Sequence, residues 1–314
     1  MHDAALIGLD WGSSRLRAYR LSRAGAVLEA RASDGGASRL AVGAAPGDRA
    51  ALFERHLREL IADWLVPGRP MIACGMVGSA HGWREAAYVS CPVEIDELHR
   101  HLMPVRGGEG LELWIVPGAS YRPTGIAPDV MRGEETQVVG VLAQDAAWAA
   151  GASIVLPGTH SKWVRIVDGK LVSFATRMTG ELFDLLRSHS VLSRSLVDST
   201  ELDRDEFERG IAAARDAPGG DLSHLLFGVR TLHLFGERTP IALTDYLSGL
   251  LIGHELASGL AQAPVELPLV LVGDERLCRR YQIGLETFGR SVSAILVDSA
   301  AAGLATIARS RGLV

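Results

Sequence analysis

The stretch that decides the fold is Ala5-Leu6-Ile7-Gly8-Leu9-Asp10-Trp11-Gly12-Ser13-Ser14-Arg15. It is a short apolar run that ends in a carboxylate and passes into a glycine turn with two hydroxyl residues. An imperfectly alternating segment, Leu16 to Leu21, follows, and Val27 to Arg31 has the composition of a third strand. Short apolar segments separated by glycine-containing turns are typical of β-hairpins. The chain is therefore predicted to open as a hairpin meander.

The same arrangement recurs near the middle of the chain. Gly12 falls on Gly158 at an offset of 146 residues, which is close to half of the 314-residue length. In both places an apolar strand meets a turn of glycine plus hydroxyl, and two further strands follow. A long internal period indicates a duplicated structural unit. The repeat predicts two domains, residues 1–148 and 149–314, with the boundary near 145–152.

The remaining pattern alternates strands with helices in both halves, which is typical of α/β proteins. We expect a terminal helix and a polar, irregular stretch over residues 193–222. Helices are predicted at 47–66, 133–150, 243–260 and 276–288 and after Glu181, and strands at 71–74, 111–116, 152–156, 268–273 and 294–297.

The composition excludes several classes of protein. Hydrophobic residues make up 47% and charged residues 22% of the chain, as in folded globular proteins. The net charge of −5 argues against a general nucleic-acid binder. Cys74, Cys91 and Cys278 are widely spaced, which favours neither a disulfide framework nor a zinc site. Without a recognisable signal peptide or a membrane-length apolar run, a cytoplasmic location is expected.

Two turns have the composition of phosphate-binding sites. Asp10, at a strand end, could hold a divalent cation through water, while Gly12 and Ser13 present N–H and O–H donors. The second turn, Gly158-Thr159-His160, has the same build without the carboxylate. An ordinary hairpin turn with an Asp cap explains the first pattern equally well.

Two further segments carry chemistry. Glu134 and Glu135 open a helix directly after Gly133, so one of them could act as a general base, although acids at helix N-termini also favour the macrodipole. Gly273 ends a late apolar strand and could seat an adenosine against backbone. A P-loop lysine motif, a strand-linked GxGxxG, GxSxG and HExxH are all absent, which disfavours the corresponding NTPases, dehydrogenases, hydrolases and zincins.

Taken in order, these segments resemble the sugar kinase, hexokinase and actin-like ATPase superfamily, and within it the 2-dehydro-3-deoxygalactonokinase family. The late region has only Gly273 where the superfamily usually has a pair of glycines. The strings that carry the resemblance are Asp10-Trp11-Gly12-Ser13, Gly75-Met76-Val77-Gly78-Ser79 with Gly82-Trp83, Met131-Arg132-Gly133-Glu134-Glu135-Thr136-Gln137, Pro157-Gly158-Thr159-His160-Ser161-Lys162-Trp163-Val164, Met178-Thr179-Gly180-Glu181-Leu182, Ser248-Gly249-Leu250-Leu251-Ile252-Gly253 and Arg280-Tyr281-Gln282.

The resemblance implies two ribonuclease-H-like domains that close around ATP and Mg²⁺, with the sugar acid bound mainly by the first and the nucleotide by the second. It also implies transfer of the γ-phosphoryl group of ATP to the 6-hydroxyl of 2-dehydro-3-deoxy-D-galactonate in galactonate catabolism. Glu134 is expected to be the base, in a slot where related kinases have aspartate, and Asp10 the Mg²⁺ ligand. The expected phosphate and nucleotide contacts are Gly12, Ser13, Arg15, Gly158, Thr159, His160 and Gly273.

The acid substrate itself requires a fixed positive patch, because a carboxylate is best held by charge-assisted hydrogen bonds. Arg39 is the first candidate and Arg15 the second, although Arg39 could equally be an exposed loop residue. Ser79, Trp83 and Glu135 are expected to line the sugar side, with a core position the alternative for Trp83.

Three other functions remain open at this point. The first is a kinase of the same fold for another sugar acid or sugar, since a few polar contacts decide the acceptor. The second is a non-catalytic, actin-like nucleotide-binding regulator, and the third is a polyphosphate or nucleotide hydrolase. The expected partners are ATP and a small sugar acid, without nucleic acid or membrane, and the oligomeric state is left open.

Overall fold

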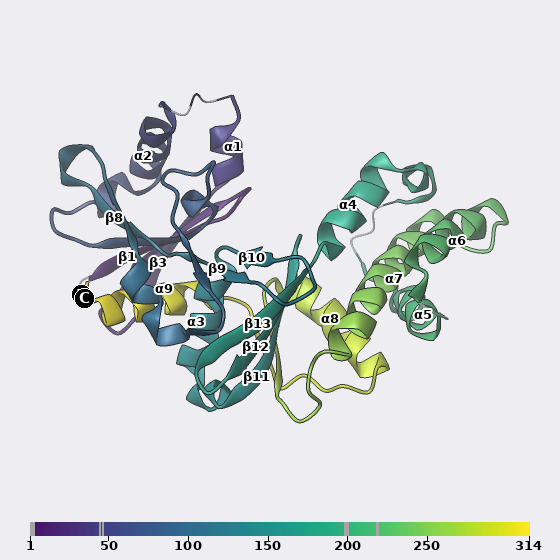
Figure 1. Cartoon of the computed structure of the whole chain (residues 1–314). Coiled ribbons are helices and arrows are strands. Elements are labelled where there is room, and N and C mark those ends of the chain that lie inside the picture. The colour runs from purple at the N-terminus through teal and green to yellow at the C-terminus, as the bar shows by residue number, and fades with distance from the viewer. Residues whose placement is uncertain (1–3, 44, 46, 198–200, 218–219) are drawn as a thin grey trace. The chain divides into compact units, whose positions relative to one another are not determined.

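A computed structural model describes residues 4–43, 45, 47–197, 201–217 and 220–314. The chain forms two compact units (Figure 1). Unit 1 comprises Met1–Gly151, Arg165–Phe174 and Asp298–Val314, and unit 2 comprises Ala152–Val164 and Ala175–Val297. The units are interleaved along the sequence, because the C-terminal helix belongs to unit 1. The division into two domains between residues 148 and 149 remains a prediction, as does the binding of the sugar acid by the first domain and of the nucleotide by the second.

Unit 1 is built on a six-stranded sheet in the order β3-β2-β1-β4-β8-β7. The pairs β1–β2, β2–β3 and β7–β8 are antiparallel, whereas β1–β4 and β4–β8 are parallel. The predicted opening meander is confirmed. The strands are β1 (Leu6–Trp11), β2 (Leu16–Leu21), β3 (Val27–Ser33), β4 (Met71–Gly75), β7 (Met103–Arg106) and β8 (Glu112–Ile115), with a second sheet β10-β9-β5 from β5 (Tyr88–Ser90), β9 (Gly118–Tyr121) and β10 (Asp129–Met131).

The helices of unit 1 are α1 (Ala37–Ala41), α2 (Arg49–Ile61), α3 (Glu134–Gln144) and α9 (Ala300–Arg311). Helices α3 and α9 pack together through two glycines. A Cβ on Gly140 would lie 1.8 Å from the Ser299 carbonyl oxygen, and one on Gly303 would lie 1.9 Å from that of Thr136. Only glycine permits these backbones to approach so closely, so α9 holds the helix that begins with Glu134.

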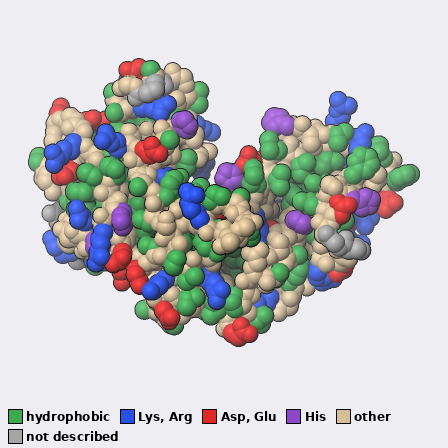
Figure 2. Space-filling view, viewed as in Figure 1, with side chains coloured by type: hydrophobic (Ala, Val, Ile, Leu, Met, Phe, Trp, Pro, Cys, Tyr) green, Lys and Arg blue, Asp and Glu red, His purple; other side chains and the backbone are tan. Residues whose placement is uncertain are grey.

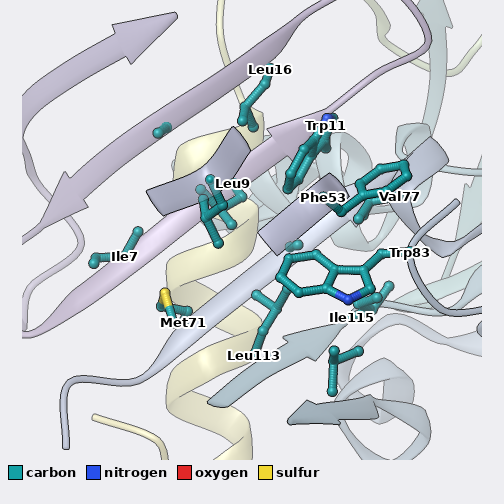
Figure 3. Close-up of a cluster of buried hydrophobic side chains, with 14 of the residues drawn as sticks. Ile7, Leu9, Trp11, Leu16, Phe53, Met71, Val77, Trp83, Leu113 and Ile115 are labelled. Atoms are coloured by element: carbon teal, nitrogen blue, oxygen red, sulfur yellow. The ribbon is translucent and has the colours of Figure 1, made fainter. Parts of the chain in front are cut away.

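Aromatic residues dominate the core of unit 1 beside the end of β1 (Figure 3). The Trp11 and Phe53 ring centroids are 5.1 Å apart, and Trp83 meets Trp11 edge to face at 6.1 Å. Leu9, on the same strand as Trp11, is also buried, because alternate strand residues share a face. Large buried rings contribute most to such a core, so the end of β1 is rigidly held.

Unit 2 repeats the strand order of unit 1. Its strands follow the order β15-β14-β11-β12-β13, which corresponds to β8-β4-β1-β2-β3. Parallel pairing joins β11 to β14 and β14 to β15. At the unit 1 end of β13, Lys170 and Leu171 pair with β6 (Val93–Glu94). The strands of this sheet are β11 (Gly151–Leu156), β12 (Ser161–Val167), β13 (Lys170–Arg177), β14 (Leu269–Val272) and β15 (Ala294–Leu296). Residues Arg165–Phe174, which form the end of β12 and most of β13, belong to unit 1.

The helices of unit 2 are α4 (Thr179–His189), α5 (Arg204–Asp216), α6 (Leu222–Leu234), α7 (Pro240–Leu260) and α8 (Glu275–Thr287). The predicted irregular stretch 193–222 is wrong over α5, a regular helix capped by the Asp203 side chain; residues 198–200 and 218–219 lie outside the described part. Its dense charges concealed an apolar stripe at Phe207, Ile211 and Ala214, which is buried. Gly210 gives α5 a close contact with α7.

Apolar side chains remain exposed over α6, toward the right in Figure 2. Phe227, Leu234 and Phe235 are more than half exposed, whereas Val229 on the same helix is buried. Short 3₁₀ helices complete the chain at Ala62–Trp64, Met76–Gly78, Ile95–His101, Gly108–Gly110, Ala146–Ala149 and Val191–Ser195. Within the described residues, no helix has the combined length and apolar character needed to cross a bilayer.

Candidate active site

Asp10 lies near the end of β1, the central strand of unit 1. The strand register places it opposite Arg17 on β2 and Cys74 on β4. Its Oδ2 is 3.8 Å from Arg17 Nε, and its side chain is 18% exposed. Burial raises the pKa of Asp10, Arg17 opposes this rise, and the negative charges of Asp298 and Glu134 add to it. The site is therefore short of positive charge, as a cation-binding carboxylate requires.

Helix α3 brings two glutamates to this end of the sheet, and the surroundings of the two side chains differ. Glu134 is half-buried, and its Oε2 accepts a hydrogen bond from the Arg132 amide at 3.0 Å. Glu135 is fully buried, and accepts hydrogen bonds from the Gly133 amide at 2.7 Å and Thr136 Oγ1 at 2.9 Å. Burial, together with the charge of Glu134, raises the pKa of Glu135 to about 7.

Close backbone contacts fix the start of α3 against the sheet. Gly133 has φ +111°, and a Cβ there would lie 3.1 Å from Gly75 Cα. Gly75 ends β4 with φ +91°, and a Cβ on it would lie 2.7 Å from the Trp11 carbonyl oxygen. Side chains at either glycine would be strained and crowded. The two glycines thus allow α3 to start directly beside the end of β1.

The turn after β1 rests on the segment before α1. The amides of Gly36, Ala37 and Ser38 donate to the carbonyl oxygens of residues 14, 12 and 13 at 3.3, 2.9 and 3.1 Å. Ser13 is exposed at the top of the turn and Gly12 is half-buried. Three main-chain hydrogen bonds therefore hold the first predicted phosphate turn, and Trp11 Nε1 adds one to the Gly35 carbonyl oxygen at 2.9 Å.

The two arginines expected to hold a carboxylate lie near each other. Arg15 Nε is 3.4 Å from Asp34 Oδ1, with both side chains 75% exposed. Arg39 donates from Nη1 to the Asp34 carbonyl oxygen at 3.4 Å. Both guanidinium groups are exposed and contact Asp34, one from the turn after β1 and the other from α1.

The other predicted sugar-side residues follow β4. Ser79 is half-buried at the end of a 3₁₀ turn, and its carbonyl oxygen accepts a hydrogen bond from the Gly82 amide at 2.9 Å. Trp83 is 8% exposed and packs against Trp11 and Phe53. These contacts make Trp83 part of the core, as the alternative interpretation held. A direct contact of either residue with a sugar stays a prediction.

The second predicted phosphate turn joins β11 to β12 in unit 2. Thr159 and His160 are exposed, and His160 Nε2 pairs with Glu181 Oε2. The Glu181 amide donates to the Thr159 carbonyl oxygen at 3.0 Å, so the first turn of α4 supports the hairpin. A Cβ on Gly180 would lie 2.5 Å from the Gly158 carbonyl oxygen.

Gly273 lies beside this turn. It follows β14 with φ +146°, its amide donates to the Leu296 carbonyl oxygen at 3.0 Å, and a Cβ on it would lie 3.4 Å from the Pro157 carbonyl oxygen. Because β11 and β14 are parallel neighbours, both strands end at the same edge of the sheet. The two predicted nucleotide-binding segments are thus brought together within unit 2.

Sequence reasoning missed several residues around Asp10. Asp298 precedes α9, far from Asp10 in the chain, and accepts a hydrogen bond from the Tyr19 hydroxyl at 2.9 Å. Burial and the charges of Asp298 and Asp10 raise the pKa of Tyr19. The alternation along β2 could have identified Arg17 and Tyr19, since Arg17 pairs with Asp10 and Tyr19 lies two residues further along the same strand. No local pattern marks Asp298.

The residues around Asp10 suit a hydrated magnesium ion. In the described part of the chain, no group of three or more His, Cys, Asp or Glu side chains is arranged to hold a metal by itself. Mg²⁺ commonly keeps several waters and takes one or two carboxylates plus substrate phosphates. A partly exposed carboxylate with raised pKa among other acids fits that mode.

A cavity of about 370 Å³ lies elsewhere in unit 1, at the opposite end of β1. Ile7, Met71, Arg58 and Leu313 are among its lining residues. None of the candidate residues lines it, and of its two acids, Glu109 and Glu112, the first is paired with Arg58 at 3.1 Å. We therefore place the candidate chemistry at the Asp10 end of the sheet.

Comparison with known proteins covers nearly the whole chain. The family model for 2-keto-3-deoxy-galactonokinase matches residues 10–307. The chain is 36% identical to "Probable 2-dehydro-3-deoxygalactonokinase DgoK1" of Rhizobium meliloti strain 1021, covering 96% of each chain. It is also 36% identical to the 2-dehydro-3-deoxygalactonokinase of Escherichia coli K12, covering 98% of each.

Solved structures agree on the fold. A crystal structure from Sinorhizobium meliloti, described as a protein of the same kinase type, has a TM-score of 0.85 and 34% identity, covering 97% of this chain and 98% of that one. An activator of 2-hydroxyisocaproyl-CoA dehydratase from Clostridium difficile has a TM-score of 0.51 at 11% identity, covering 98% and 96%, and therefore shares the fold alone. The predicted α/β fold of the actin-like ATPase type is confirmed.

Proposed function

The chain belongs to the 2-keto-3-deoxy-galactonokinase family, and from this premise we propose that it transfers the γ-phosphoryl group of ATP to the 6-hydroxyl of 2-dehydro-3-deoxy-D-galactonate. The observation that carries the proposal is the family match over residues 10–307, which includes both Asp10 and Glu134. Their charges are close enough for Glu134 to raise the pKa of Asp10. The product would enter galactonate catabolism.

At the γ-phosphorus, the reaction forms one P–O bond and breaks another. The acceptor oxygen attacks the γ-phosphorus, the bond from that phosphorus to the bridging oxygen of ADP breaks, and the hydroxyl proton passes to a base. Phosphoryl transfer depends mainly on positioning and charge neutralisation. Bound Mg²⁺ supplies positive charge to the phosphate oxygens, and Asp10 is the residue that would hold it, through water.

Glu134 is the better base of the two glutamates. Glu135 is fully buried and its oxygens accept hydrogen bonds from Gly133 and Thr136, so its role in our proposal is structural. Glu134 is partly exposed and is the first residue of α3. It follows Gly133, which lacks a side chain and so lets a ligand approach the backbone closely. A base must reach the proton that it removes, which favours the partly exposed Glu134 over the fully buried Glu135.

The acidic substrate would be oriented by Arg39 and Arg15, whose exposed guanidinium groups flank Asp34. Planar guanidinium groups bind carboxylates with two parallel hydrogen bonds. The nucleotide would be bound by Gly158, Thr159 and His160 together with Gly273, which lie at one edge of the unit 2 sheet.

A coupled ADP-release assay tests the proposal. ATP and Mg²⁺ are combined with both 2-dehydro-3-deoxy sugar acids, the parent aldonates, common hexoses and a blank without acceptor. We expect turnover on the galactonate-derived acid and little hydrolysis in the blank. Glu134→Gln should lower kcat about 10³-fold, whereas the neighbouring Glu135→Gln should lower it less than tenfold.

Each other result changes a definite part of the proposal. Turnover on a different acceptor would replace the substrate and keep the kinase. Equal loss in both variants, or activity retained by Glu134→Gln, would remove Glu134 as the base. Nucleotide binding without turnover on any acceptor would favour the regulator, and ATP hydrolysis that acceptors leave unchanged would favour the hydrolase.

A further inference from the structure

A buried carboxyl group in unit 2 has no role in the proposed reaction. Glu255 lies within α7 and is 2% exposed. Its Oε1 accepts a hydrogen bond from Trp163 Nε1 at 2.8 Å. Its Oε2 accepts one from the Tyr281 hydroxyl at 2.7 Å and another from Thr179 Oγ1. A buried carboxyl group is costly unless it is fully hydrogen-bonded, and three donors converge on this one.

The three donors come from three different elements. Trp163 is in β12, the strand that leaves the second hairpin turn. Thr179 is the first residue of α4, the helix whose first turn supports that hairpin. Tyr281 is in α8, which follows Gly273. Glu255, on α7, thus joins β12, α4 and α8, three elements that begin or end beside the Gly158 turn and Gly273.

The network extends from Glu255 into the turn itself. Tyr281 donates its only hydroxyl proton to Glu255, so the Ser161 hydroxyl, 2.9 Å away, is left to donate to the tyrosine oxygen. Ser161 is fully buried, and the Gly158 amide points at its Oγ from 3.4 Å. A continuous chain of polar groups therefore runs from Glu255 to the glycine of the turn.

We propose that Glu255 is the positioning residue for the nucleotide: it holds the Gly158–Ser161 turn, the start of α4 and α8 in the arrangement that binds the phosphates of a nucleoside triphosphate. The inference rests on the proposed function. Glu255 itself touches no substrate, so its effect must pass through Ser161, Thr179 and Tyr281. An amide in its place can accept at only one atom and would oppose an N–H to at least one donor.

The test separates nucleotide affinity from acceptor affinity. In Glu255→Gln we expect the KM for ATP to rise at least tenfold, with the KM for the acceptor changed less than twofold. Tyr281→Phe removes the link to Ser161 and should raise the KM for ATP about threefold or more. The matched control is Asp245→Asn, on the same helix and 3% exposed, whose carboxyl binds Arg280 at 2.7 Å and the Asp203 amide at 2.8 Å.

Titration with ADP gives a second readout that does not require turnover. Weaker ADP binding in Glu255→Gln, with Asp245→Asn close to wild type, supports the proposal even if no acceptor is phosphorylated, in which case only the proposed function fails. The proposal is overturned if Asp245→Asn weakens nucleotide binding equally, or if the KM for ATP is unchanged in Glu255→Gln. Should that variant not fold, an unchanged KM in Tyr281→Phe overturns it.

Discussion

The two hairpin turns have nearly the same sequence build, but the molecule supports them by different means. The turn at Gly12 is held by three main-chain hydrogen bonds from residues 36–38. The turn at Gly158 is held by the start of α4 and by side chains that lead to the buried Glu255. Main-chain support tolerates many side chains, whereas side-chain support depends on particular ones. Substitutions should therefore affect the two turns differently.

The charges around the two turns also differ. The first follows Asp10, which lies among Arg17, Asp298 and Glu134. The second follows Leu156 and includes His160, which pairs with Glu181; Lys162 comes next, and its Nζ donates to the His160 carbonyl oxygen at 3.2 Å. An acidic turn suits a hydrated cation, and a turn with basic neighbours suits phosphate oxygens directly. From this difference we expect the first turn to hold the cation and the second to contact the phosphates.

The largest expected effect comes from removing the carboxylate that only the first turn has. Asp10→Asn should lower kcat about 10³-fold, because charge neutralisation at the phosphates is the main source of catalysis. The same variant should unfold at a higher temperature at pH 8, since burial raises the pKa of Asp10 and the ionised group costs stability. Coupled kinetics and thermal unfolding measure the two effects.

A loss of stability together with activity in Asp10→Asn would indicate a structural role instead. A kcat within tenfold of wild type would contradict the assignment of the cation to the first turn. Either result would mean that the charge difference between the two turns does not reflect a difference in function.

The next effect concerns the buried carboxyl of unit 1. The pKa of Glu135 is raised from 4.5 to about 7, so between these values the folded state binds more protons than the unfolded state. Its contribution to the free energy of unfolding is therefore largest below pH 4.5 and falls as pH rises to 7. At about 1.4 kcal/mol per pH unit, the fall is about 3 kcal/mol.

Glu135→Gln should remove this part of the pH dependence and be more stable relative to wild type at pH 8 than at pH 5. Denaturant unfolding at several pH values measures the difference, with the exposed Glu109→Gln as control. Parallel curves for wild type and Glu135→Gln would show that Glu135 has an ordinary pKa.

The smallest effect compares the two glycines that press on the turns. A Cβ on Gly36 would lie 2.3 Å from the Ser13 carbonyl oxygen, and one on Gly180 would lie 2.5 Å from that of Gly158. Each alanine variant should lower the free energy of unfolding by about 2 kcal/mol. Gly228, in α6 with open space around it, is the control, and its alanine variant should gain about 0.5–1 kcal/mol.

Chemical denaturation gives these three values. If Gly180→Ala were as mild as Gly228→Ala, α4 would not support the second turn. If Gly36→Ala were mild, the main-chain support of the first turn would be adaptable, and the contrast between the repeats would have to be drawn from charge alone.

Much of the fold could be predicted because local patterns of apolar and turn residues determine many of its strands and helices. Alternation and turn residues identified β1, β2 and β3 nearly to their ends, and α7 and α8 followed from long helical patterns. The helix predicted over 133–150 ends at Gln144, because Asp145 turns extended and caps the next short helix. The charged α5 was missed because its buried stripe is formed partly by Gly210 and Ala214, which carry little apolar signal.

The site was less predictable, since its supports are distant in sequence. Asp10 and the two glutamates stood out by residue type and neighbouring glycines. Asp298 and Glu255 did not, because a buried carboxyl is recognised only by the donors that surround it, and those come from other elements. The requirement for glycine at position 36 likewise becomes visible only in the folded chain, where its backbone contacts the Gly12 turn.

The return of α9 to unit 1 has a consequence for synthesis. Helix α9 contacts β1, β2, β4 and α3, all of which leave the ribosome long before it does. Unit 2 has its residues complete by Val297, so it can finish folding while unit 1 still lacks a helix that packs on its central strand. Contacts of such long sequence separation form slowly. The half of the protein that is translated first should thus be the last to become native, and until then it is a natural client for chaperones.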